Sequence, residues 1–455
     1  MDDTYERILL EIDEEKQVYA NRLFQCLAIS IRPLRVDELA ELFAVLPNAE
    51  STPDFDVSWR PEDPEAFILS ACSTLVTIVK NRDRTIVQFS HFSVKEYLTS
   101  DRIANSAPVS HFQVLPKPAH TLLARACLGV LLQLDYSIDE TKIGNFPLAR
   151  YAAENWVDHA SFEDVSSDIR DWMDRLFDKD KPHLAAWLWV YDIDDEHGIY
   201  YDDDDMDRAH PKPPDAVPLY YAALCGFRGL VERLLGLHPQ DLNAEGGVCG
   251  TPLSAALHKG HLNIALFLLE HGADGEKRGR AGQTGLYIAS SRGYAEIVRT
   301  LLDRGANLNA RYDDWDEEGE DVLWTPLHVA SRNGRLEVAS VLLEYGANVN
   351  PVDNWGSSLL HHASLCSSDD LVRFLLDHGA DVDTRDRYHW TALHLAAYKG
   401  TLQVVKTLLE RGANPHSRTI NGDTPFELVR DRPSMSPGLR SEFKQLLSEL
   451  TGESG

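Results

Sequence analysis

One motif recurs along the C-terminal half of this 455-residue chain and constrains its fold more than any other feature. The five clear copies read TPLSAALHKGHLNIALFLLEHGAD, TGLYIASSRGYAEIVRTLLDRGAN, TPLHVASRNGRLEVASVLLEYGAN, SLLHHASLCSSDDLVRFLLDHGAD and TALHLAAYKGTLQVVKTLLERGAN. They begin at positions 251, 284, 325, 358 and 391, so the steps are 33, 41, 33 and 33 residues. Weaker copies begin at Val217 and Thr424. A fixed period of this length predicts a solenoid, in which each repeat buries its apolar face against its neighbours.

The period of 33 residues and the pattern T-P-L-H-x-A resemble the ankyrin repeat. Thr251 and Thr325 are suited to cap a first helix, whose first turn accepts Pro252 and Pro326 without losing a hydrogen bond. We expect about seven repeats over residues 215–430, of which the first and last are degenerate, and a capping helix and tail over residues 431–455. The resemblance implies a module without catalytic groups that binds proteins through its concave face and finger-like turns.

Aromatic residues occupy the expected finger positions. Trp324 and Trp390 directly precede the first Thr of their repeats, and Trp355 and Tyr388 lie nearby in theirs. The 41-residue step adds a long acidic finger, RYDDWDEEGEDVLW, that carries Trp315. Exposed aromatic residues with a charged rim are typical of binding hot spots, although such rings can also serve only to pack neighbouring turns. The residues predicted to contact a partner are Trp315, Trp324, Trp355, Tyr388, Trp390, Tyr287 and Tyr398.

Histidine recurs at the fourth position of the motif, in His328, His361 and His394. In the T-P-L-H turn we interpret these side chains as hydrogen-bonding spacers between repeats rather than as metal ligands. Asp192, Asp194 and Glu196 resemble the start of a calcium loop, but the following glycine falls one place late. The sequence therefore predicts no metal site and no cofactor.

The first hundred residues predict three helical segments followed by a β-hairpin. A first helical stretch breaks near Asp13, a second runs from Arg32 to Leu46, and a third follows a Pro- and Asp-rich loop. LVTIVKNRDRTIVQFSH then alternates as two strands around a turn at Asn81–Arg84. This order is a winged-helix pattern. The expected fold class is mainly α, with a winged-helix domain and a helical linker region before the ankyrin solenoid.

DDTYERILLEID, RPLRVDELAELFA, FSHFSVKEYLTS and FPLARYAAENWVDHA are similar to the segment that follows the NACHT nucleotide-binding domain in fungal NLR-like proteins with ankyrin tails. The resemblance implies that the winged helix packs on a nucleotide domain, and that His91 matches a nucleotide-sensing histidine. No G-x-x-x-x-G-K-[ST] loop occurs in the chain. We therefore expect His91 to be a buried, hydrogen-bonded structural residue, a vestige of a sensor.

The remaining segments complete the expected organisation. A winged-helix domain is predicted over residues 1–103, a helical bridging region over 104–190, and an acidic linker over 191–214. The net charge of −28 argues against nucleic acid and against anionic membranes, and the expected recognition helix, EAFILSACSTL, has no Lys or Arg. The acidic linker favours a partner with a basic surface.

Two functional interpretations follow. In the first, the chain is a non-enzymatic adaptor that binds a protein partner through the ankyrin fingers and concave face. In the second, it is the regulatory half of a split or truncated NLR-like switch that acts with a separate NACHT ATPase. Common catalytic motifs such as H-E-x-x-H and G-x-S-x-G do not occur. The acidic N-terminus lacks the basic and apolar regions of a signal peptide, which predicts a cytoplasmic location, with the nucleus as the alternative.

Overall fold

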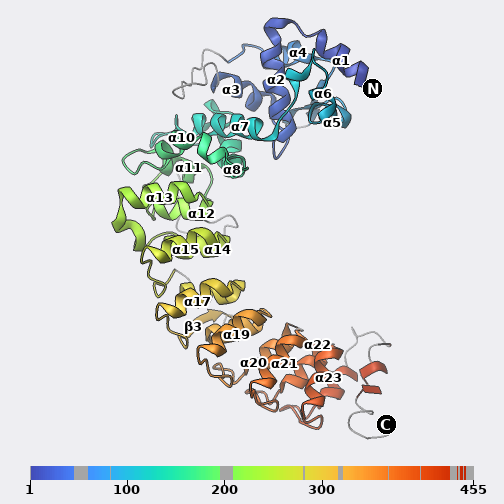
Figure 1. Ribbon diagram of the computed structural model, residues 1–455, viewed down its shortest axis with the longest axis vertical. Helices are drawn as coiled ribbons and strands as arrows, with labels where there is room; N and C mark the ends of the chain where they lie inside the picture. Colours follow the sequence, from blue (N-terminus) through green and yellow to red (C-terminus); the bar gives the residue numbers. More distant parts are fainter. Residues whose placement is uncertain are drawn as a thin grey trace. The chain divides into compact units, whose positions relative to one another are not determined.

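The computed structural model describes residues 2–45, 60–81, 84–194, 209–279, 282–315, 321–366, 368–399 and 401–430, with isolated pieces between 438 and 446. The described chain is mainly helical and includes two short β-hairpins. Contacts divide it into two compact units, Met1–Asp241 and Leu242–Gly455. Each unit is described by itself below (Figure 1).

The N-terminal unit opens with helices and one hairpin, in the predicted order. The break expected near Asp13 is confirmed, because one helix ends at Leu10 and the next begins at Glu14. The elements are α1 (Asp2–Leu10), α2 (Glu14–Ile29), α3 (Val36–Val45), α4 (Pro64–Cys72), β1 (Val76–Asn81), β2 (Arg84–Phe89), α5 (Phe92–Leu98) and α6 (Asp101–Ala104).

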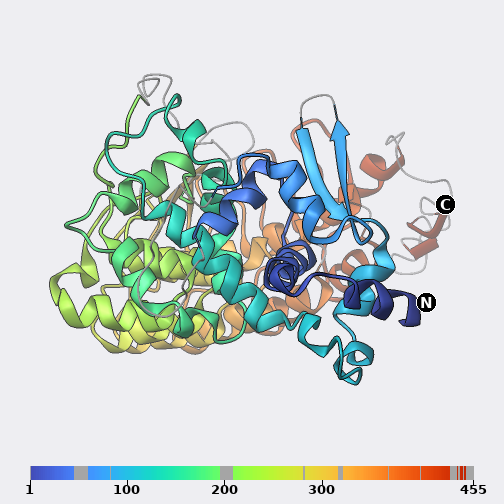
Figure 2. The same ribbon diagram turned by 90° about the horizontal axis from the view of Figure 1, so that it is seen from above.

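Strands β1 and β2 form the expected antiparallel hairpin, with pairs running from Val76↔Phe89 to Asn81↔Arg84. Figure 2 shows them as adjacent light-blue arrows. The segment before α3 contacts the hairpin through an isolated β-bridge between Arg35 and Ile86, and Val87 N–H donates to the Leu34 carbonyl at 3.0 Å. Helices α2, α3 and α4 pack on one another beside this hairpin.

A buried central helix organises the rest of this unit. Helix α7 (Pro116–Leu131) packs against α2, α3, α8 and α10, and its inward side chains are small or aliphatic. The residues that it buries include Ala119, Leu123, Ala124, Cys127, Leu128 and Leu131. The surrounding elements are α8 (Ala149–Ala160), α9 (Val165–Asp168), α10 (Arg170–Leu176), α11 (His183–Val190) and two single-turn 3-10 helices, Ser110–Phe112 and Ile143–Asn145.

The first, degenerate repeat belongs to the N-terminal unit. It consists of α12 (Pro218–Cys225) and α13 (Arg228–Leu237), and α13 packs on α10. An aromatic cluster joins the two parts, with the Trp156 ring 5.3 Å from that of Phe227 and 5.3 Å from that of Trp187. On the surface, Arg233 donates to Asp174 at 2.6 and 2.9 Å.

The C-terminal unit is a stack of helix pairs in which each inner helix packs on the next inner helix and each outer helix on the next outer helix. The inner helices are α14 (Pro252–Lys259), α16 (Gly285–Arg292), α18 (Pro326–Arg332), α20 (Leu359–Leu365) and α22 (Ala392–Lys399). The outer helices are α15 (Leu262–Glu270), α17 (Ala295–Asp303), α19 (Leu336–Glu344), α21 (Asp369–Asp377) and α23 (Leu402–Glu410), and α24 (Pro425–Arg430) follows on α22.

The additional residues of the 41-residue step form a second hairpin. β3 (Tyr312–Trp315) pairs antiparallel with β4 (Asp321–Trp324), and Tyr312 lies opposite Trp324. The tip of this finger, the Trp315 side chain, most of the acidic linker and nearly all of the expected capping helix over 431–455 lie outside the described residues.

Candidate functional site

The site is built on the turn that opens each repeat. The hydroxyls of Thr325, Ser358 and Thr391 lie 2.8, 2.8 and 2.9 Å from Nδ1 of the histidine three residues on. The same histidine nitrogen accepts the backbone N–H of the capping residue, at 3.0 Å in the Ser358 turn and 3.1 Å in the Thr391 turn. The capping residue and the histidine are therefore joined by two hydrogen bonds, as in a capping box.

The other histidine nitrogen reaches the following repeat. Nε2 of His361 lies 3.0 Å from the Trp390 carbonyl, and Nε2 of His394 lies 3.3 Å from the Asp423 carbonyl. A carbonyl can only accept, so Nε2 carries the proton and Nδ1 is the acceptor. The interpretation as spacers between repeats is confirmed for His361 and His394, whereas Nε2 of His328 is buried without a hydrogen-bond partner among the described residues. Burial lowers the pKa of His361 and His394, so the neutral ring is the stable form.

Buried or half-buried aspartates shape the fingers. The Asp353 carboxylate accepts hydrogen bonds from the backbone N–H groups of Trp355 and Ser357, at 2.9 and 2.8 Å. It also lies 3.1 Å from Nε2 of His362. Asp386 accepts the N–H groups of Tyr388 and Trp390 at 2.9 and 2.8 Å. These bonds fix the finger backbones and hence the places of the aromatic residues beside them.

Two neighbouring fingers meet through an arginine that lies between aromatic rings. The Arg387 guanidinium lies 3.0 Å from the Trp355 ring centroid and 4.9 Å from that of Tyr388. Its NH2 donates to the Tyr388 hydroxyl at 2.9 Å, and its backbone N–H donates to the Trp355 carbonyl at 2.8 Å. A cation over two rings makes a rigid, amphipathic surface. We call Trp355, Arg387, Tyr388, Trp390 and Tyr398 the finger cluster.

The outer edge of the finger cluster is open to solvent. Tyr388 and Tyr398 are each 41% exposed, and the Trp390 ring packs edge-on against Tyr398 at 5.7 Å. In the adjacent turn, the 58%-exposed Ile420 donates its N–H to the Tyr388 carbonyl at 3.0 Å. Arg387 and Ile420 were not among the predicted site residues. The sequence signal for Arg387 was its place beside Tyr388 in a finger, whereas Ile420 lies in a degenerate copy and has no such signal.

Two predicted contact residues lie elsewhere. Tyr287 is 2% exposed and packs edge-on against Tyr312 at 4.7 Å, so the prediction that it binds a partner is wrong. Its ring is covered because the extra hairpin places Tyr312 beside it, where the Tyr312 hydroxyl lies 2.6 Å from that of Thr284. Trp324 is partly buried against this cluster, and its Nε1 donates to Asp353 at 3.3 Å.

His91 is exposed, so the expectation of a buried residue is wrong. Its backbone is extended and caps α5, and Nδ1 lies 2.6 Å from the Ser93 hydroxyl, which in turn is 2.6 Å from the Tyr5 hydroxyl. The side chain points to the start of the helix, while Val94 and Tyr97 fill the core below. The expectation of a hydrogen-bonded residue is confirmed.

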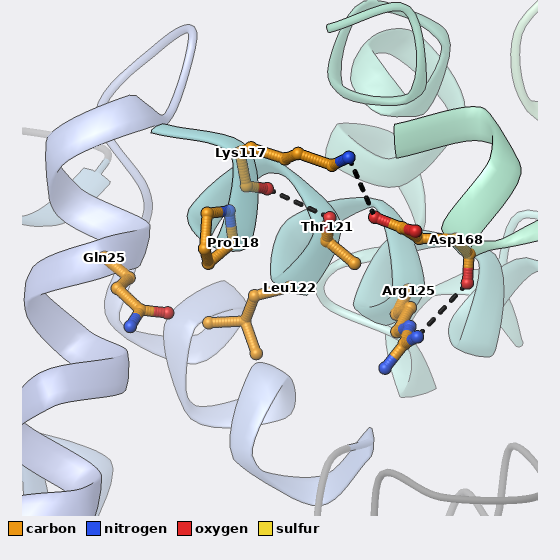
Figure 3. Close-up of a pocket in the computed structure, with 7 residues that line it drawn as sticks. All are labelled: Gln25, Lys117, Pro118, Thr121, Leu122, Arg125 and Asp168. Atoms are coloured by element: carbon orange, nitrogen blue, oxygen red, sulfur yellow. Dashed lines mark hydrogen bonds and ion pairs between the residues drawn. The ribbon is translucent and has the colours of Figure 1, made fainter. Parts of the chain in front are cut away.

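The N-terminal unit has an open hollow of about 340 Å³ between α2 and α7 (Figure 3). Lys117 extends to Asp168 at 3.8 Å, and Arg125 NH2 donates to the Asp168 carbonyl at 3.1 Å. Gln25 of α2 lies on the opposite side, and Leu122 of α7 lies between it and Arg125. The polar groups along this side of the hollow thus already bind one another. Among the described residues, no group of three or more His, Cys, Asp or Glu side chains is placed to hold a metal ion.

Comparison with known proteins agrees with the repeat geometry. Residues 219–312 and 327–419 match the family model described as ankyrin repeats (3 copies), and residues 293–343 match ankyrin repeats (many copies). Residues 219–419 are therefore similar to ankyrin repeats.

Similar curated proteins include the azaphilone pigments biosynthesis cluster protein L of Monascus ruber, 33% identical over 290 residues, which are 60% of this chain and 59% of that protein. Protein phosphatase 1 regulatory subunit 27 of Homo sapiens is 39% identical over 83 residues, which are 18% of this chain and 49% of that protein. The chain thus spans between about half and three fifths of these relatives. The crystal structure of the ankyrin repeat domain of Bcl-3 aligns with 51% of this chain and 99% of its own, at 30% identity and a TM-score of 0.40.

Within the described residues, every helix is too short or too polar to cross a lipid bilayer.

Acid should destabilise the ankyrin array. Burial lowers the pKa of His328 to about 3, well below the 6.5 of an exposed histidine. The folded state therefore binds fewer protons than the unfolded state, so stability is complete above pH 6.5 and falls as the pH drops below it. For His328 alone we expect a loss of about 1 kcal/mol between pH 7.5 and pH 5.5, measured by urea denaturation.

The variant His328→Gln should show a smaller loss between these two pH values than the wild type. His271 is exposed and bonds locally to the Phe267 carbonyl, so His271→Gln is the matched control for the substitution itself. Equal unfolding free energies at pH 7.5 and 5.5 in the wild type would contradict the prediction.

Proposed function

We propose that this chain is a non-enzymatic interaction protein that binds a protein partner through the finger cluster. The observation that carries the proposal is the Arg387 guanidinium between the Trp355 and Tyr388 rings, beside the half-exposed Tyr398. Aromatic and arginine side chains on a rigid scaffold contribute much binding energy at small entropic cost. One similar protein is named as a regulatory subunit of protein phosphatase 1, and this name supports a role in binding another protein.

The proposal is tested by site-directed photo-crosslinking in cells that express the full chain. A photo-reactive phenylalanine analogue replaces Tyr388 in one variant and the half-exposed Lys406, on outer helix α23, in a matched control. We expect a defined protein to crosslink at position 388 and not at position 406. Its affinity for Tyr388→Ala/Tyr398→Ala should be at least about tenfold lower than for the wild type. The same set of proteins at both positions would disprove a specific site.

A second candidate function is the regulatory half of a split or truncated NLR-like switch, with a NACHT ATPase as a separate chain. The arrangement that favours it is the winged-helix order of α2, α3 and α4 beside the β1–β2 hairpin, extended by the Arg35–Ile86 bridge. Beside His91, the Phe92 ring is 69% exposed at the start of α5, which suits a docking face. Capture of an ATPase by a photo-crosslinker at position 92 would favour this function over the first.

The domain boundaries at residues 103, 190, 214 and 430, the absence of catalysis and the cytoplasmic location stay predictions from the sequence.

A further inference from the structure

Basic residues recur at the C-terminal ends of three successive inner helices. Lys259 ends α14, Arg292 ends α16 and Arg332 ends α18, and Arg335 follows in the turn before α19. Lys259 and Arg292 each lie eight residues after the capping threonine of their repeat, whereas Arg332 and Arg335 lie seven and ten residues after Thr325. We call these four residues the basic stripe.

The stripe is continuous in space. Arg335 Nε donates to the Ser291 carbonyl at 3.1 Å, which joins the end of α18 to the end of α16. Helices α14 and α16 pack on each other, and burial together with the nearby Arg292 charge lowers the pKa of His258 at the end of α14 to about 4. Helices α14, α16 and α18 pack side by side in this order.

The three arginines of the stripe are not neutralised by the described part of the chain. Arg292, Arg332 and Arg335 make no ion pair with any described carboxylate. On the outer helices the cations do pair, as Arg299 with Glu344 at 2.9 Å and Arg411 with Asp377 at 2.7 Å. In a chain with a net charge of −28, unpaired cations gathered on one face form a local positive site.

We propose that the basic stripe binds an extended, acidic segment of a protein partner. The inference rests on the proposed protein-binding function and specifies the chemistry of the partner. Packed helices lie about 8–10 Å apart, and an extended peptide rises about 3.3 Å per residue. Carboxylates spaced three residues apart on the partner segment therefore meet the cations of successive repeats. The favourable charge contacts also steer the segment toward the array.

The test measures fluorescence anisotropy of a labelled peptide, Glu-Ser-Ser repeated four times, against the full chain at low salt. A Lys-Ser-Ser peptide of equal length is the control ligand. We expect the acidic peptide to bind more tightly than the basic one and to weaken as salt is raised. Arg292→Gln/Arg332→Gln should weaken binding about fivefold. Arg299→Gln/Arg411→Gln, which removes the same charge from the outer helices, should change it by less than about twofold.

Three results would overturn the proposal: no preference of the wild type for the acidic peptide, unchanged binding by Arg292→Gln/Arg332→Gln, or an equal loss in the outer-helix control. Thermal unfolding, followed by circular dichroism, checks that both variants fold. The crosslink at position 388 is measured separately. A retained crosslink with no peptide preference would leave the proposed function intact and reject the acidic partner. No specific crosslink at position 388 together with retained peptide binding would reject the finger cluster as the binding site and leave the basic stripe supported.

Discussion

Replacing Trp156 by alanine should lower the free energy of unfolding of the N-terminal unit by about 4 kcal/mol. The Trp156 ring is fully buried and packs on Phe177, Trp187 and Phe227, with centroids 5.3–6.3 Å apart. Truncation removes its buried apolar area and leaves a cavity that rings held by three other segments cannot fill. Because Phe227 precedes α13, the first repeat should also lose its attachment to the bridging helices.

Hydrogen exchange measured by mass spectrometry, resolved along the full chain, checks this result. Peptides from α8, α11 and α13 should lose protection, while those from α18 to α23 should keep it. Trp156→Phe should cost less, since most of the ring volume remains. Tyr136→Ala removes a ring that is 47% exposed, and it serves as the control with little expected effect. Unchanged exchange in α13 of Trp156→Ala would show that the cluster does not hold the first repeat.

The variant Glu38→Gln should destabilise the N-terminal unit by about 3 kcal/mol. The Glu38 carboxylate is fully buried and accepts two hydrogen bonds from Arg32, at 2.7 and 2.8 Å, and two from Arg35, at 2.8 and 3.0 Å. Burial alone raises the pKa of Glu38, but the bonds from Arg32 and the Arg35 backbone outweigh it and the pKa is lowered. A neutral amide removes the buried counter-charge of Arg32 and Arg35, and its NH₂ group points a donor toward their donors.

The neighbouring carboxylate provides the control. Asp37 also approaches Arg35, at 3.9 Å, but its side chain is 55% exposed, so Asp37→Asn should change the stability by less than about 0.5 kcal/mol. Urea denaturation followed by circular dichroism at pH 7.5 compares the three proteins. Equal losses in Glu38→Gln and Asp37→Asn would mean that the buried pair contributes no more than a surface pair.

The Glu38 network also links the start of α3 to α8. The Arg32 guanidinium lies 4.9 Å from the Tyr151 ring centroid, and the Tyr151 hydroxyl lies 2.9 Å from Nε2 of His159. Glu38 thus fixes Arg32, which contacts α8, so Glu38→Gln should also reduce the stability of α8.

The repeat period was enough to predict the solenoid, because each repeat can bury its apolar face only by stacking on the neighbouring repeats. The same reasoning identified the capping threonines and the bridging histidines, whose hydrogen-bonding partners are set within the turn and one period away. The β1–β2 hairpin followed from alternation around a polar turn. These features are local or periodic, so the sequence by itself determined them.

Side-chain exposure was decided only by the tertiary structure. The sequence suggests that Tyr287 contacts a partner, but Tyr312 of the inserted hairpin covers its ring. It suggests that His91 lies in the core, but the side chain caps α5 instead. Arg387 joins the finger cluster only because its guanidinium lies over the Trp355 ring of the neighbouring finger. Whether a ring meets solvent, a cation or another ring depends on which neighbour reaches it. A pattern along the chain specifies residue types and intervals, whereas these contacts form between segments that packing brings together.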